Sequence, residues 1–289
     1  MVVRFLTVLL LAAAAVRLSA SGHVPVPVNA VRLHSAGENL VTVDVTVNSA
    51  GPFTFLLDTG ANRSAVSQRV AVALQLPTIA STSVVSAGGH RSHRVVRVQQ
   101  LTLGSVTKER LPVAILDDIE LCAVGGGIDG ILGQDFLLDQ NYTLDYEHRR
   151  LVFERSTTAE APGTALAITA TEGRWLATLP PRSAGGGLQF VPDSGASGLV
   201  LFDRGAGVSL PTRALDVDGA LTTLAGRQSS RAVVIPRLTI GSIVIKNRPA
   251  LVVERRDPDA PAGDGLLPLS MFASVTFDAS RRIMTVRER

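Results

Sequence analysis

The sequence predicts an all-β protein made of two homologous lobes with a cleft between them. Three observations lead to this prediction: a four-residue motif occurs twice, a second apolar-glycine element follows each copy at the same distance, and apolar residues alternate with polar ones between turn residues. The chain has 289 residues, of which 46% are hydrophobic and 18% charged. Two domains of ordinary size with apolar cores are compatible with these values.

The repeated motif contains an aspartate in both copies. Residues 58–61 read Asp-Thr-Gly-Ala, and residues 193–196 read Asp-Ser-Gly-Ala, 135 positions later. Each copy follows an apolar run. Residues 130–133 (Gly-Ile-Leu-Gly) and 265–268 (Gly-Leu-Leu-Pro) begin 72 positions after the respective aspartates. One such motif arises by chance, but two with the same downstream spacing indicate an internal duplication.

The duplication extends beyond the motifs. Residues 101–105 (Leu-Thr-Leu-Gly-Ser) return as Leu-Thr-Ile-Gly-Ser at 238–242. A period of this length is too long for a solenoid and fits two fused copies of one domain. We therefore expect one lobe at 23–154, a linker rich in polar residues and proline at 155–164, and a second lobe at 165–289.

Within the first copy the pattern favours β-strands over helices. Residues 41–47 alternate apolar and polar side chains, and turn residues at 48–52 separate them from an apolar run that leads into Asp58. This pattern predicts a hairpin that ends at the aspartate. The other elements expected in this copy are strands at 95–103, 111–116, 144–146 and 150–153, a helix at 67–76, and a turn or two of helix at 134–139.

The N-terminal segment, residues 1–22, reads as a signal peptide. Arg4 precedes an apolar stretch at 5–16, which is too short to span a bilayer, and small residues follow it. A retained anchor is the alternative, although Arg17 interrupts the apolar run. Removal of the segment takes away two positive charges, so the formal charge falls from +3 to +1. We expect an exported protein without stable membrane insertion after cleavage.

Cysteine and sequon usage narrows the expected location. Cys122 is the only cysteine, so no intramolecular disulfide can form. Asn62 and Asn141 begin Asn-x-Ser/Thr sequons, and a glycan on Asn62 would crowd any site built at Asp58. Together these features favour a bacterial periplasmic or secreted protein.

The chemistry that the motifs suggest is acid–base chemistry by paired carboxylates. If the two loops meet, Asp58 and Asp193 face each other and share a proton, because two such close carboxylates do not both ionise easily. The ionised member then acts as a general base on water, and the protonated member donates to a carbonyl oxygen. Such a pair hydrolyses amides without a metal or another cofactor.

The residues after each aspartate would support it. Thr59 and Ser194 supply a hydroxyl beside each carboxylate. Gly60 and Gly195 let the loop backbones approach closely, since glycine has no side chain in the way.

These residues resemble the aspartic proteases, in particular the retropepsin-like family in a fused, two-copy form. Residues 55–61 (Phe-Leu-Leu-Asp-Thr-Gly-Ala) match the family's catalytic motif, and 131–133 match its second apolar-apolar-Gly element. The resemblance covers roughly residues 35–155 and 165–287. It implies acid-protease-like β-barrel lobes, an extended peptide or protein substrate in the cleft, and an aspartic endopeptidase in which each lobe donates one aspartate.

The resemblance also implies a glycine-rich hairpin, or flap, that closes over the peptide. By position the flap of the first lobe is residues 86–90, with Gly88 and Gly89 at its tip. The corresponding segment of the second lobe is 225–228, which contains Gly226.

The second copy departs from the family pattern at three positions. Pro192 directly precedes the aspartate, Ser194 replaces threonine, and Pro268 replaces the glycine of the second element. Proline cannot donate a backbone hydrogen bond. These changes keep open an alternative function, a catalytically inactive periplasmic module that binds peptides or acts as a scaffold.

Other functions find less support. Residues 125–130 fit Gly-x-Gly-x-x-Gly, but the helix and parallel strand of a dinucleotide fold are missing from the pattern. His90 and His93 read as polar residues of a loop tip, residues 117–120 as a solvated acidic loop, and Cys122 as a buried thiol. The arginines are scattered, which argues against nucleic-acid binding. We expect no cofactor, no metal and, because the lobes are fused, a monomer.

Overall fold

The computed structural model describes residues 29–37, 39–86, 89–154, 161–180, 187–203, 205, 208–223, 226–254 and 262–289. The expected signal peptide, Gly88 and most of the expected linker lie outside these residues. Among the described helices, none has the length and apolar character needed to cross a membrane.

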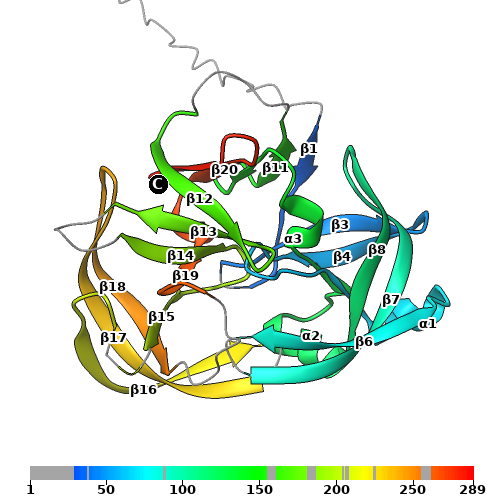
Figure 1. Cartoon of the computed structure of the whole chain (residues 1–289), viewed down its shortest axis with the longest axis horizontal. Helices are drawn as coiled ribbons and strands as arrows, with labels where there is room; N and C mark the ends of the chain where they lie inside the picture. Colours follow the sequence, from blue (N-terminus) through cyan, green and yellow to red (C-terminus); the bar gives the residue numbers. More distant parts are fainter. Residues whose placement is uncertain are drawn as a thin grey trace, which may run out of the picture.

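Figure 1 shows two β-rich lobes joined by strands from both halves of the chain. The first lobe is an eight-stranded sheet in the order β2-β3-β4-β9-β5-β8-β7-β6. Its strands are β2 (His34–Ser35), β3 (Val41–Val47), β4 (Ala50–Leu57), β5 (Ala65–Ser67), β6 (Thr78–Ser86), β7 (Gly89–Leu103), β8 (Val106–Leu116) and β9 (Gly130–Leu132).

The remaining strands form a thirteen-stranded sheet in the order β1-β11-β10-β20-β21-β12-β13-β14-β19-β15-β18-β17-β16. Three of its strands come from the first half of the chain: β1 (Ala30–Arg32), β10 (Tyr142–Asp145) and β11 (Arg150–Phe153). The others are β12 (Thr164–Thr171), β13 (Arg174–Leu179), β14 (Leu188–Asp193), β15 (Leu199–Asp203), β16 (Arg213–Thr223), β17 (Gly226–Ile240), β18 (Ile243–Glu254), β19 (Gly265–Pro268), β20 (Ser274–Asp278) and β21 (Ile283–Arg287).

Helices are short. They are α1 (Gln68–Ala73), α2 (Asp118–Val124), α3 (Gln134–Leu137) and the 3₁₀ turn η1 (Leu269–Met271). Helix α1 begins after Ser67, whose hydroxyl accepts a hydrogen bond from the N–H of Val70 at 3.1 Å. The prediction of an all-β protein with two lobes is confirmed.

The duplicated sequence gives the same strand register in both lobes. Phe55 of β4 pairs in parallel with Gly130 of β9, and Phe190 of β14 pairs in parallel with Gly265 of β19. The two pairs occupy equivalent positions of the repeat. In each lobe the glycine lies under the phenylalanine ring and against a carbonyl of the neighbouring strand, so a Cβ at either position would overlap its neighbours.

The lobes are joined through what we call the interlobe sheet, the strands β1, β11, β10, β20, β21 and β12. Its central pair is β10 and β20, one from each half of the chain. At this seam the Oγ1 atoms of Thr143 and Thr276 lie 2.7 Å apart. The rings of Tyr142 and Phe277 stack with centroids 4.8 Å apart, so the seam has both a polar and an apolar contact.

Several sequence predictions about single elements are accurate and others are wrong. Strand 41–47 is found with the predicted bounds, whereas β7 begins six residues earlier than predicted. The prediction that the acidic segment 117–120 is a solvated loop is wrong, because this segment begins helix α2. There Glu120 is 4% exposed and accepts the Asp117 N–H at 2.9 Å. An Asp-x-x-Glu pattern before apolar residues is a capping-box signal that indicates this helix.

Two further side chains near this helix differ from the prediction. His93 is not at a loop tip but lies buried on β7, with Nδ1 3.0 Å from the Ile115 carbonyl and Nε2 3.6 Å from Glu120. Cys122 is exposed, not buried. Both corrections follow from helix α2, which covers His93 and leaves Cys122 on the surface.

Substitution of Gly265 tests the shared register. In Gly265→Ala the added Cβ meets the Val200 carbonyl and lies 3.0 Å from the Phe190 ring. We expect a loss of unfolding free energy of about 1–3 kcal/mol, the usual cost of overpacking. Gly198→Ala is the matched control, since no atom lies within 4 Å of a Cβ there. Equal stabilities of the two variants in chemical denaturation would contradict the packing described.

Candidate functional site

The two aspartates lie at the ends of equivalent strands. Asp58 directly follows β4, and its N–H donates to the Leu132 carbonyl of β9 at 3.0 Å. Asp193 is the last residue of β14 and pairs with Pro268 of β19. In both lobes a parallel neighbour therefore holds the strand end that carries the aspartate.

Four hydrogen bonds cross between the lobes just after the aspartates. The N–H of Thr59 donates to the Ser194 hydroxyl at 3.0 Å, and the N–H of Ser194 donates to the Thr59 hydroxyl at 2.9 Å. Each hydroxyl in turn donates to a carbonyl of the opposite strand, Thr59 to Pro192 at 2.8 Å and Ser194 to Leu57 at 2.7 Å. We call this set the crossed hydrogen bonds. Both side chains are at most 1% exposed.

Backbone amides hold each carboxylate in place. The N–H groups of Gly60 and Ala61 donate to Oδ1 of Asp58 at 2.9 and 3.0 Å. The N–H of Gly195 donates to Oδ1 of Asp193 at 2.8 Å. A Cβ on Gly195 would lie 2.6 Å from Cγ of Asp58, and a Cβ on Gly60 would collide with Asp193 in the same way. Only glycine fits, because each loop passes against the carboxylate of the other lobe.

The two carboxyl groups are hydrogen-bonded to each other. Burial raises the pKa of both above the usual value, and the nearby Asp58 charge raises the pKa of Asp193 further. Both carboxylates receive backbone hydrogen bonds from the two residues that follow the loop serine or threonine, but Asp58 is only partly buried, whereas Asp193 is 7% exposed. The arrangement favours a shared proton that resides on Asp193 while Asp58 is ionised.

A glutamine that sequence reasoning did not single out supports the first aspartate's loop. Gln134 is fully buried at the start of α3, and its Nε2 donates to the Thr59 carbonyl at 3.0 Å. The next residue, Asp135, accepts hydrogen bonds from the N–H and hydroxyl of Ser64 at 2.9 and 2.5 Å. The sequence feature that could have identified Gln134 is its position directly after the apolar-glycine element at 130–133.

The proline departures of the second lobe are accommodated. Pro192 contributes only its carbonyl to the crossed hydrogen bonds, and proline keeps that group. In the first lobe the N–H of Gly133 donates to the Ser64 hydroxyl at 3.0 Å. The equivalent positions hold Pro268 and Leu199, so the donor and the acceptor of this hydrogen bond are replaced together.

The segments predicted as flaps lie at the ends of two long hairpins. Strands β6 and β7 pair from Ser86 and Gly89 onward, and β16 and β17 pair from Thr223 and Gly226. Gly89 and Gly226 are thus the first residues of their strands. Helix α2 of the first lobe contacts β16 of the second, so the second hairpin reaches across from its own lobe.

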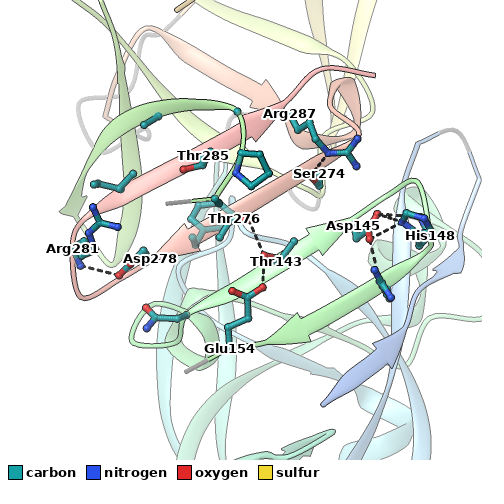
Figure 2. Close-up of a pocket in the computed structure, with 18 residues that line it drawn as sticks. Thr143, Asp145, His148, Glu154, Ser274, Thr276, Asp278, Arg281, Thr285 and Arg287 are labelled. Carbon is teal, nitrogen blue, oxygen red and sulfur yellow. Dashed lines mark hydrogen bonds and ion pairs between the residues drawn. The ribbon is translucent and has the colours of Figure 1, made fainter. Parts of the chain in front are cut away.

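A separate cavity of about 490 Å³ lies on the interlobe sheet, among residues of β10, β11, β20 and β21. In Figure 2, Thr143 and Thr276 lie in its middle, with Asp145 and His148 at one end and Asp278 and Arg281 at the other.

The cavity also borders the one metal-like cluster among the described residues, Asp145, Glu147 and His148, whose ligand atoms lie within 4.8 Å of one another. Arg150 contacts Asp145 at 3.0 Å, and Arg287 contacts Glu147 at 2.6 Å. The carboxylates are already paired, so the cluster reads as an ion-pair network.

A family model described as aspartyl protease matches residues 43–136 and 180–270, one match in each lobe. The chain belongs to the aspartyl protease family. Each match contains one of the two aspartates and the glycine that follows it by two residues. A search of curated proteins found no significant match.

Solved structures with a similar fold include aspartic proteinase from Irpex lacteus (15% identity, 90% of this chain and 96% of that chain, TM-score 0.49). Basic 7S globulin from soybean is similar at 11% identity, covering 89% and 95% of the two chains with a TM-score of 0.48. A retropepsin-like aspartic protease from Rickettsia conorii matches at 14% identity, covering 43% and 87% with a TM-score of 0.29.

Removal of one hydroxyl tests the crossed hydrogen bonds. Ser194→Ala leaves the buried Thr59 N–H and Leu57 carbonyl without these partners. We expect a loss of about 1–3 kcal/mol in unfolding free energy, the cost of an unsatisfied buried group. Ser194→Thr keeps the hydroxyl that the first lobe uses at Thr59 and should recover most of the loss. If the alanine variant is as stable as the wild type in denaturant titrations, the crossed hydrogen bonds do not contribute as described.

The pKa directions predict how stability depends on pH. Since burial raises the pKa of Asp193 above the ordinary value of 3.8, this group contributes stability below that pH and loses it as pH rises through the folded-state pKa. Asp193→Asn imitates the protonated form. We expect its Tm to exceed that of the wild type at neutral pH, with the gain shrinking as pH falls toward 3.8.

Asp145→Asn is the control, because its effect on stability at neutral pH should be opposite to that of Asp193→Asn. Burial raises the pKa of Asp145, but hydrogen bonds from His148 and Arg150 outweigh burial and the net pKa is lowered. This variant should lose stability at neutral pH, and the loss should disappear in acid. If both variants respond alike to pH in thermal denaturation, the assignment of the proton to Asp193 is wrong.

Proposed function

We propose that this chain is an aspartic endopeptidase that hydrolyses peptide bonds with Asp58 and Asp193 as its catalytic pair. The observation that carries the proposal is the hydrogen-bonded carboxyl pair, in which each loop glycine lies against the carboxylate of the other lobe. Paired carboxyl groups with separated pKa values are the arrangement that acid–base hydrolysis requires. The family match in both lobes supports the same reaction class.

The proposed reaction uses water as the nucleophile. Ionised Asp58 takes a proton from water while the water oxygen attacks the peptide carbonyl carbon, and Asp193 donates its proton to the carbonyl oxygen. The resulting tetrahedral diol then breaks its C–N bond. As this bond breaks, Asp58 donates the proton it took from water to the nitrogen, and Asp193 takes a proton back from one hydroxyl of the diol. The products are an amine and a carboxylic acid that keeps both oxygens, and the pair returns to its singly protonated state.

The substrate we propose is an extended peptide segment between the lobes. Strands β6 and β16 are the edge strands of the two sheets, and extended peptides bind such edges through backbone hydrogen bonds. Because one chain supplies both aspartates, we propose that a monomer is sufficient. We also propose that the protein works outside the cytoplasm, on the basis of the signal-like residues 1–22.

The decisive experiment compares Asp58→Asn with the wild type on a peptide library. The variant lacks the general base, so we expect its kcat to fall by at least about 10²-fold, as for loss of a general acid–base group. Circular dichroism and Tm should show an intact fold. Asp44→Asn, which changes an exposed aspartate on β3, should retain full activity.

The experiment also separates the alternative function. A wild-type chain that binds peptides but cleaves none from acidic to neutral pH would indicate a peptide-binding or scaffolding module and overturn the proposal. Undiminished cleavage by Asp58→Asn would overturn the mechanism.

A further inference from the structure

Arg174 is a buried cation close to the carboxyl pair. It is the first residue of β13 and is 6% exposed. The turn before it packs on the loop that follows Asp58: Asn62 donates through Nδ2 to the Glu172 carbonyl at 3.3 Å, and a Cβ on Gly173 would lie 3.4 Å from Cβ of Asn62. Arg174 thus belongs to the second lobe but sits beside the first lobe's catalytic loop.

The guanidinium of Arg174 is poorly paired for a buried charge. Its contact with a carboxylate in the described structure is between Nη1 and Oε2 of Glu172 at 3.8 Å, and the Glu172 side chain is 52% exposed. Its Nε is buried and has no hydrogen-bond partner among the described residues. A guanidinium has five N–H donors suited to a carboxylate, and buried charges are normally paired.

The neighbouring carboxyl pair does not satisfy this charge directly. Burial raises the pKa of Asp58, and the charge of Arg174 is among the groups that lower it, so the two are in electrostatic reach. No hydrogen bond joins Arg174 to either aspartate in the described structure. The pair with its shared proton carries one negative charge and attracts Arg174, but without a hydrogen bond between them among the described residues.

The first lobe has no counterpart of this cation. Val43 pairs with Phe55 in the first lobe, and Ala177 pairs with Phe190 in the second, so the register makes Leu40 the equivalent of Arg174. Leu40 packs on apolar residues of its own lobe. The two sides of the pseudo-symmetric site therefore differ, with an apolar residue on one side and, on the other, a cation whose Nε has no partner among the described residues.

We propose that Arg174 is a specificity-determining residue that binds a carboxylate of the substrate peptide. This inference rests on the proposed function. The carboxylate comes from an Asp or Glu side chain near the cleaved bond, or from the C-terminus of a short peptide; both offer the two oxygens that a guanidinium binds in parallel. Glu172 and Gly173, the two residues before Arg174, line a cavity of about 440 Å³ with Asn62 and Gln134; Arg174 follows this lining in the chain but does not itself line the cavity.

The test measures the ratio of kcat/KM between matched peptides. One series exchanges Glu for Gln at each position around the cleaved bond, and a second exchanges a free C-terminus for an amide. We expect the wild type to prefer the carboxylate in one series by at least about tenfold, since a hydrogen bond to a charged group contributes that much. The series that shows the preference identifies the source of the carboxylate.

Three variants assign the preference to Arg174. Arg174→Leu, which installs the residue of the equivalent position, should bring the ratio close to one. Arg174→Lys should restore part of the ratio, because it keeps the charge but not the paired donors. Arg32→Leu removes an exposed arginine on β1 and should leave the wild-type ratio unchanged. A ratio near one in the wild type, or an unchanged ratio in Arg174→Leu, overturns the inference.

A binding measurement keeps this test separate from the proposed function. Affinities of the same peptide pairs are measured by calorimetry with Asp58→Asn, with and without Arg174→Leu. Tighter binding of the carboxylate peptide that disappears with Arg174→Leu supports the inference even for a chain that cleaves nothing. Equal affinities for both peptides overturn it even if the wild type is an active peptidase.

Discussion

The crossed hydrogen bonds between Thr59 and Ser194 are the constraint on which the rest of the structure depends. They join two sheets that otherwise belong to different lobes, and both hydroxyls act as donor and acceptor in a buried setting. Loss of either hydroxyl leaves buried backbone groups unsatisfied, which is costly in a low-dielectric interior. The bonds therefore fix the distance between the lobes at the point where Asp58 and Asp193 meet, and a small shift there would separate the carboxyl groups.

This fixed distance also explains the electrostatics of the site. Holding two carboxyl groups together in a buried place disfavours ionisation of both, so burial and mutual repulsion raise the pKa of Asp193 while amide hydrogen bonds favour the charged form of Asp58. The site is less stable than an apolar core would be at neutral pH. Functional sites commonly retain such a loss of stability, and here the interlobe sheet and the crossed hydrogen bonds offset it.

The sequence was enough to predict the two-lobed fold, but not most of the differences between the two lobes. The long internal repeat was enough to predict two lobes and the meeting of Asp58 with Asp193, because spacing and motif are local features of the chain. Helix α2 was missed because the acidic residues 117–120 were interpreted by charge and not as a cap. The pairing of β10 with β20 and the position of Arg174 were not predictable, since both depend on contacts between distant segments.

The duplicated halves have diverged by exchanging groups in compensating sets. Where the first lobe joins Gly133 to Ser64 by a hydrogen bond, the second replaces both partners with Pro268 and Leu199. Such exchanges keep the backbone while removing polar groups, so the second lobe can lose a motif residue without losing the position of Asp193. Arg174 is an exchange with little compensation among the described residues: it adds a buried charge at a position that is apolar in the first lobe, and its ion-pair contact is at 3.8 Å to an exposed glutamate. A cost of this kind beside the Asp58–Asp193 pair is consistent with the proposed role of Arg174 in binding a substrate carboxylate.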